Sequence, residues 1–232
     1  MADGVAIRRL ADNPIIHPGL DTRIGENING PSVIRVPEWL PRPLGRFYLG
    51  CCLPAPPHQF TRAALSADGL AFTAREELLG VSYWRAFRWR GWHYGLAMPG
   101  HVYRSRDPLR GYAEGPVLFS PDMRHAAVQL VGDTLRVYYT DVGDCPERIL
   151  RAEIALTDEW WSWRATDPVA VLAPETGYEG ADLPLALSER GSIHEPARQL
   201  RDPCIFEDEG RTWLFYVVAG ERGIALAELG VV

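Results

Sequence analysis

Polar side chains that suit sugar recognition stand just before several strand-like runs of the sequence. Arg201 and Asp202 precede the run 203–206, and Asp122 precedes the run 126–130. Carboxylates and guanidinium groups form strong, directional hydrogen bonds with hydroxyl groups, and aromatic rings stack on the apolar face of a sugar. These residue types therefore predict a site for a small carbohydrate. The candidates are Asn29, Ser32, Tyr83, Arg85, Asp122, Arg124, His125, Arg201 and Asp202.

Glu179 is the candidate proton donor. It lies in the stretch Tyr178-Glu179-Gly180-Ala181-Asp182, within a long segment between two groups of strands, and long loops in compact domains are often functional. A loop folded over the pocket would desolvate the Glu179 carboxyl group and raise its pKa toward the working pH. Asp182 is a further candidate for sugar binding in this loop. The alternative for Glu179 is an ordinary solvated glutamate.

Structural interpretations of the other candidates stay open. Arg201 and Asp202 can form an ion pair at a strand entrance, with Pro203 starting the strand. The same interpretation applies to Asp122. His125 can be a hydrogen-bonded structural histidine or can contact a water or cation at a channel mouth.

No metal or cofactor is predicted. His17, His93 and His101 stand apart from Cys, Asp or Glu at ligand spacing, which excludes the usual zinc patterns. The sequence contains no glycine-rich dinucleotide or phosphate loop and no GxSxG element. Its four cysteines form no CxxC pair, so we expect reduced thiols.

The elements that must position these residues are short β-strands. No segment sustains an amphipathic helical pattern, whereas runs of β-forming residues recur with tight polar turns between them. Four units of two core strands and an outer strand are visible. They cover 31–36, 45–49 and 61–66; 84–89, 92–97 and 101–105; 126–130, 134–140 and 148–155; and 203–206, 212–218 and 223–229.

This repeat predicts an all-β propeller of antiparallel blades, formed by residues 1–232 as one domain. Residues that precede the innermost strands of a propeller converge at one mouth of its central channel. We therefore expect the candidate sugar-binding residues to lie close together there. The fourth unit lacks an outermost strand, and we expect the segment 5–10 to pair there and close the ring. A β-sandwich is the alternative fold.

Charge and hydropathy exclude some partners. All 24 basic residues are arginines, they are scattered among 30 acidic residues, and the net charge is −6. A nucleic-acid partner is not expected, because phosphate binding needs a basic stripe. No apolar run approaches the roughly 20 residues that cross a bilayer, so we expect no membrane partner and a cytoplasmic location. The sequence indicates no particular oligomeric state.

Several motifs carry a family resemblance, which their order along the chain makes specific. The motifs are Asn13-Pro14-Ile15-Ile16, Asn27-Ile28-Asn29-Gly30-Pro31-Ser32-Val33, Ser120-Pro121-Asp122-Met123-Arg124-His125, Tyr178-Glu179-Gly180-Ala181-Asp182, Arg198-Gln199-Leu200-Arg201-Asp202-Pro203 and Ala219-Gly220-Glu221-Arg222-Gly223-Ile224-Ala225. Nearly the whole chain resembles uncharacterised bacterial proteins related to glycoside hydrolase family 43. The resemblance implies a five-bladed propeller that cleaves glycosidic bonds with inversion, using a carboxylate base, a second carboxylate that tunes pKa values, and a glutamic acid donor.

Two departures from that family pattern bear on function. The family's catalytic base comes from an Asp-Pro pair in the first blade, but the sequence here reads Asn29-Gly30-Pro31. Asp122 or Asp202 could replace the base if one lies about 6.5–9.5 Å from Glu179. The proline-rich stretch 51–57 stands where another blade would follow, which predicts a four-bladed or incomplete ring.

Three functions remain open on the sequence. The chain is a glycoside hydrolase acting on a small sugar or oligosaccharide, a catalytically inactive propeller that binds carbohydrate, or a truncated relic with little function. Whether it is an enzyme is undecided, because the missing first-blade aspartate favours the binding module.

Overall fold

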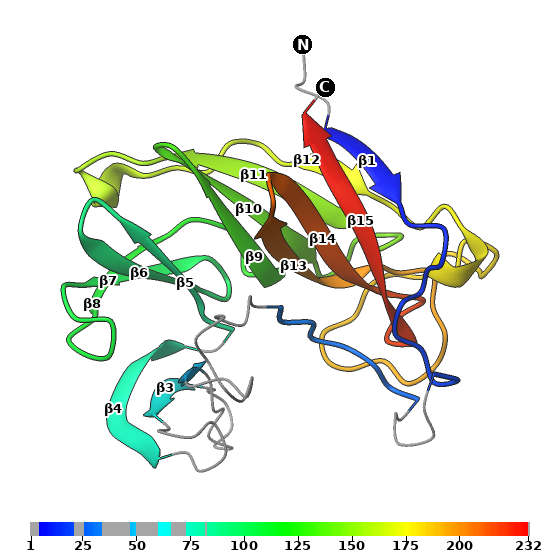
Figure 1. Cartoon of the computed structure of the whole chain (residues 1–232), viewed down its shortest axis with the longest axis horizontal. Coiled ribbons are helices and arrows are strands. Elements are labelled where there is room, and N and C mark those ends of the chain that lie inside the picture. Colours follow the sequence, from blue (N-terminus) through cyan, green and yellow to red (C-terminus); the bar gives the residue numbers. More distant parts are fainter. Residues whose placement is uncertain are drawn as a thin grey trace. The chain divides into compact units, whose positions relative to one another are not determined.

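In the computed structural model of the chain, the described residues are 5–20, 26–33, 47–49, 60–65, 73–81 and 83–231. Their regular structure is almost wholly antiparallel β-strand, with two short 3₁₀-helices, η1 (Trp160–Ser162) and η2 (Gly177–Glu179). The strands form four antiparallel sheets in which, apart from the pairing of β1 with β15, neighbours along the chain are neighbours in space (Figure 1). This up-and-down order is that of propeller blades and confirms the predicted fold class.

The four sheets are numbered in chain order from β2 onward, and β1 belongs to the fourth sheet. The first has β2 (Phe47–Leu49), β3 (Phe60–Leu65) and β4 (Thr73–Val81), and the second has β5 (Arg85–Trp89), β6 (Trp92–Ala97), β7 (His101–Ser105) and β8 (Ala113–Val117). The third has β9 (Met123–Val131), β10 (Thr134–Asp141), β11 (Ile149–Ala155) and β12 (Val169–Leu172). The fourth has β13 (Arg201–Asp208), β14 (Arg211–Val218), β15 (Gly223–Val231) and β1 (Val5–Arg9).

The chain divides into two compact units. Unit 1 comprises residues 1–33, 122–155 and 165–232 and contains the third and fourth sheets. Unit 2 comprises residues 34–121 and 156–164 and contains the first and second sheets together with η1. Each unit has its own buried core. That the whole chain forms one domain stays a prediction.

The N-terminal strand completes the C-terminal sheet. β1 pairs antiparallel with β15, and Ile7 stands opposite Leu229 (Figure 1). The pairing confirms that the segment beginning at Val5 supplies the strand that the fourth repeat lacks. It gives the backbone groups of one edge of β15 hydrogen-bond partners, which an exposed edge strand would leave open to other chains.

Alternation of side chains builds the core of unit 1. Along β15 the buried residues are every second one, with Ala225, Ala227 and Leu229 facing inward. They join Tyr216 from the same sheet and Tyr138 from the third sheet in one apolar cluster. The period of two puts one face of each sheet in this cluster, so the two sheets bury their apolar surface against each other.

Aromatic packing builds the core of unit 2. Gly80 and Gly95 leave room for the indole of Trp84, which a Cβ atom at either glycine would overlap. The Trp84 ring also packs against Tyr103 and Tyr112, with centroids 5.0 Å apart in both cases. A glycine within a strand often marks such a close approach.

Most predicted strands coincide with observed ones, and the mismatches have clear causes. The core strands of the second, third and fourth repeats are confirmed by β5 to β7, β9 to β11 and β13 to β15. The outer strands β8 and β12 were not predicted, because short edge strands such as Ala113–Val117 combine Gly and Pro and show little alternation. The proline-rich stretch 51–57 lies outside the described residues.

Candidate functional site

Two inner strands of unit 1 share an unusual backbone feature near their starts. The pairing of β9 with β10 shifts register at His125, and that of β13 with β14 shifts at Asp202. His125 has φ 48° and Asp202 has φ 45°, values that non-glycine residues rarely adopt. A bulge of this kind redirects a side chain, and such strain is often found at functional sites.

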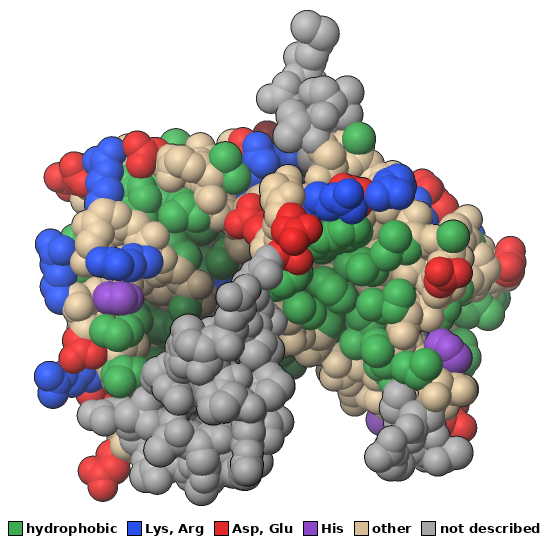
Figure 2. All heavy atoms as spheres, viewed as in Figure 1, with side chains coloured by type: hydrophobic (Ala, Val, Ile, Leu, Met, Phe, Trp, Pro, Cys, Tyr) green, Lys and Arg blue, Asp and Glu red, His purple; other side chains and the backbone are tan. Residues whose placement is uncertain are grey.

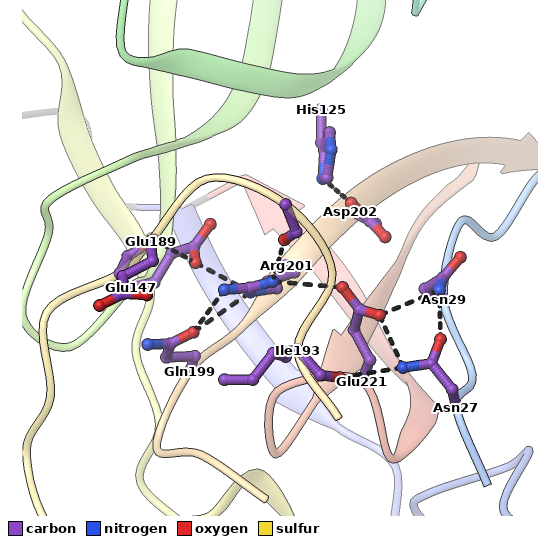
Figure 3. A network of polar contacts seen from close by, with 12 residues as sticks. Asn27, Asn29, His125, Glu147, Glu189, Ile193, Gln199, Arg201, Asp202 and Glu221 are labelled. Carbon is purple, nitrogen blue, oxygen red and sulfur yellow. Dashed lines mark hydrogen bonds and ion pairs between the residues drawn. The ribbon is translucent and has the colours of Figure 1, made fainter. Parts of the chain in front are cut away.

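The two redirected side chains meet. Nδ1 of His125 contacts Oδ1 of Asp202, and the backbone N–H of Gly30 donates to Oδ2 of Asp202 over 3.0 Å (Figure 3). Asp202 is 6% exposed and His125 is half-buried. An imidazole and a backbone amide thus hold the Asp202 carboxylate near the starts of β9 and β13. Two predicted residues, His125 and Asp202, meet there, together with Gly30, which follows the predicted Asn29.

Arg124 and Arg201, the residues just before this pair, share one carboxylate. Nε of Arg201 lies 2.9 Å from Oε2 of Glu147, and Nε of Arg124 lies 3.7 Å from Oε1. Ser188 also donates its hydroxyl to Oε2 over 2.6 Å. Arg124, Arg201 and Glu147 are all buried. Because a buried charge is costly unless it is paired, Glu147 connects the two blades.

Arg201 extends the network to a second glutamate. Its NH1 group lies 3.2 Å from Oε1 of Glu221, while Nε and NH2 donate to the side-chain oxygen of Gln199 (Figure 3). Asn27 and Asn29 donate to the other Glu221 oxygen over 2.9 and 3.1 Å. The two arginines and the two glutamates balance each other's charge, so the network can remain buried.

The network also holds a long loop that follows η2, residues 183–197. Arg124 donates to the carbonyl of Glu189, Arg201 to that of Gly191, and Asn27 to that of Ile193. The three carbonyls belong to alternate residues, so this part of the loop presents three acceptors to the side chains of the network. A cavity of about 240 Å³ lies under this loop and is lined by Arg201 and Gln199 among others.

Glu179 lies in a different set of contacts. Its carboxylate is fully buried, and it accepts from Nε of Arg9 over 2.8 Å and from the hydroxyl of Tyr216 over 2.9 Å. Its second oxygen accepts the backbone N–H groups of Glu175 and Thr176. Burial and the charge of Glu179 raise the pKa of Tyr216 far above its usual range. Four donors therefore surround the predicted proton donor, an arrangement that stabilises the chain around η2.

The remaining predicted residues lie at other places. Asp122 is exposed and pairs with Arg190 at 3.6 Å, and Ser32 is exposed. Asp182 is exposed beside Gly177 of η2. Arg85 is half-buried at the start of β5 in unit 2. The contacts of unit 1 thus bring Asn29, Arg124, His125, Arg201 and Asp202 into one network, and the other candidates lie elsewhere among the described residues.

Glu147 and Glu221 are central residues that sequence reasoning missed. Both lie in the turn between the second and third strands of a blade, and each is followed by an arginine, Arg148 or Arg222. The repeated Glu-Arg pair is the sequence signal that could have identified both glutamates. Strand patterns did not select it, because it falls in turns, where charged residues are usually solvated.

A half-buried acid, Asp141, ends β10 just before the turn that contains Glu147. Burial and the nearby charges of Asp144 and Asp122 raise the pKa of Asp141 to about 6. Arg148 pairs with Asp144 at 3.0 Å. Within the described part of the chain, no group of three or more His, Cys, Asp or Glu side chains has an arrangement suited to a metal ion.

Two solved structures similar to this chain are those of a beta-fructofuranosidase and an alpha-L-arabinofuranosidase. Bombyx mori GH32 beta-fructofuranosidase BmSUC1 is similar at a TM-score of 0.50 and 14% identity, over 89% of this chain and 48% of that chain. An alpha-L-arabinofuranosidase from Lactobacillus brevis gives a TM-score of 0.49 and 16% identity, over 74% of this chain and 59% of that chain. Such low identities show the fold alone. The chain has a glycoside-hydrolase-like propeller fold.

Sequence comparison adds one viral relative. Uncharacterized protein R118 of Acanthamoeba polyphaga mimivirus is 39% identical over a match that covers 72% of this chain and 51% of that protein. The chain thus spans about half the length of this curated relative. No family model matches the sequence. In the described ranges, no helix has the length and apolar character needed to span a membrane.

Proposed function

We propose that the chain binds a small carbohydrate at the bulged starts of β9 and β13, with Asp202 as the main acceptor for sugar hydroxyls. The observation that carries the proposal is the pairing of Asp202 with His125, each held at a positive φ by a bulge. A carboxylate and an imidazole fixed side by side offer both acceptor and donor atoms, which the hydroxyl groups of a sugar match.

The contacts favour binding over hydrolysis. Inversion needs an acid and a base about 6.5–9.5 Å apart across the scissile bond. Glu179 accepts four hydrogen bonds inside the protein, so its carboxylate suits a structural function better than proton donation. Asn29 stands at the family's base position and donates to Asn27 and Glu221. Asp202 is then a binding carboxylate, held by His125 and the backbone of Gly30.

The test is calorimetric titration of the full chain with a panel of pentoses, hexoses and short oligosaccharides. Asp202→Asn should weaken binding at least tenfold, because a charged acceptor becomes a neutral amide. Asp122→Asn is the matched control, since Asp122 is exposed and pairs with Arg190; it should keep the wild-type affinity. Equal affinity of the wild type and Asp202→Asn would contradict the proposal.

Turnover is measured on the same panel by chromatography of the products. The proposal expects intact sugars after incubation. Release of a smaller sugar by the wild type, lost in Asp202→Asn, would make the chain a glycoside hydrolase with Asp202 in its active site.

A further inference from the structure

A cleft in unit 2 combines aromatic rings with guanidinium groups. Its volume is about 760 Å³, within the range of small-ligand sites. Trp92 from β6, Arg104 from β7 and Trp161 from η1 are among the residues that line it. Sheet and 3₁₀-helix thus contribute to one concave surface.

Two arginines of the cleft are stacked on indole rings. Cζ of Arg104 lies 4.4 Å from the ring centroid of Trp92 and 4.1 Å from that of Trp160. Cζ of Arg106 lies 3.7 Å from the ring centroid of Trp92. Cations over aromatic faces at these distances are attracted by the ring electrons. The stacking therefore restrains both guanidinium groups before any ligand arrives.

Trp161 presents an unusual open surface beside this stack. Trp161 is 59% exposed, whereas the neighbouring Trp160 is 5% exposed. Figure 2 shows basic and hydrophobic side chains together on the surface at the left of the view, where Figure 1 labels β5 to β8. An exposed indole beside restrained hydrogen-bond donors is a typical sugar platform, because a sugar ring has one apolar face and a hydroxyl rim.

The charges of the cleft select among ligand classes. Three arginines line it, and three acidic residues, Glu77, Asp107 and Glu114, line it too. A balanced charge gives little attraction for phosphates or nucleic acid. The many charged groups around the rings also disfavour an apolar peptide, because they would lose water on binding. A neutral, polyhydroxylated ligand satisfies both conditions.

We propose that this cleft is a second carbohydrate site that binds a neutral oligosaccharide. Trp161 stacks on one sugar ring, and Arg106 donates to hydroxyl groups. The site belongs to unit 2 and does not depend on the Asp202 site of unit 1.

The experiment uses saturation-transfer NMR and calorimetry on the full chain with oligosaccharides of arabinose, xylose, glucose and fructose. Every variant carries Asp202→Asn, so that binding at the unit 1 site is weakened at least tenfold in all of them. Trp161→Ala should weaken oligosaccharide binding roughly fivefold to tenfold, the effect of losing one stacked aromatic ring. Trp213→Ala, which removes a partly exposed indole of unit 1, is the matched control and should bind as its parent does.

Arg106→Gln is a second variant, and thermal melting checks that each protein is folded. Arg106→Gln should also weaken oligosaccharide binding, because it removes a restrained guanidinium group. Equal affinity with and without Trp161, or no oligosaccharide bound to the Asp202→Asn parent, would overturn the proposal. Ultracentrifugation covers the remaining alternative: a dimer that Trp161→Ala dissociates would make the cleft a self-association surface.

Discussion

Arg124 and Arg201 occupy corresponding positions in two blades, and both bind the buried carboxylate of Glu147. Each arginine follows a buried apolar residue and precedes a residue with positive φ, His125 or Asp202. The same local design therefore places a cation in the interior and a polar group at the bulge in both blades. Since the bulged residues contact each other, we expect Glu147 to position His125 and Asp202 through the two arginines.

Replacement of Glu147 should strongly destabilise unit 1. Glu147→Gln leaves two buried arginines with too little negative charge, and breaking such a pair costs about 3–5 kcal/mol of unfolding free energy. Urea denaturation followed by circular dichroism measures the loss. Glu153→Gln is the control, because Glu153 is partly exposed on β11 with Arg136 and Arg151, and it should change stability by less than about 1 kcal/mol. Similar losses in both variants would contradict a central role for Glu147.

Replacements of Glu179 and Glu175 can be compared directly for their effect on stability, because both glutamates pair with Arg9. Glu179→Gln should lower the unfolding free energy by about 2 kcal/mol, since a side-chain NH₂ group would face donors in place of an acceptor. Glu175→Gln should have little effect, as its side chain is 66% exposed. Heat denaturation gives both values. A stable Glu179→Gln protein with lost sugar binding would instead place Glu179 in the binding site.

Asp141 should make stability fall as the pH rises from about 4 to about 6. Its pKa in the folded chain is raised to about 6 from an ordinary 3.8, so the folded state keeps a proton that the unfolded state releases in this window. Asp141→Asn removes the effect and should be about 1 kcal/mol more stable than the wild type at pH 7, allowing for solvent screening. The two proteins should melt alike near pH 3. An advantage for Asp141→Asn that does not change with pH would exclude this titration.

Gly95 tests the aromatic core of unit 2. A Cβ atom there would overlap the indole of Trp84, so Gly95→Ala should cost about 2–3 kcal/mol through overpacking. Near-ultraviolet circular dichroism should show disturbed tryptophans. The control is Gly230→Ala on β15, where the nearest side-chain atom would be 3.5 Å away, and it should be close to neutral. An unchanged melting temperature in Gly95→Ala would mean that Trp84 can move aside.

The strands were largely predictable because their signals are local. The alternation along β15 and the turn at Gly132-Asp133 between β9 and β10 can be recognised within a few residues. The pairing of β1 with β15 also followed from the sequence, since the fourth repeat was one strand short. The edge strands β8 and β12 escaped prediction because their residues give no strong period.

The sequence by itself determined the repeated strands and the residue types at the strand starts. Only the tertiary structure decided what each charged group binds. Glu179 and Asp202 are both acids near glycine or proline in the sequence, yet four donors enclose the first, and a histidine and one amide hold the second. The reason is physical: hydrogen bonds and burial depend on partners that are distant in the chain, and no local pattern records them.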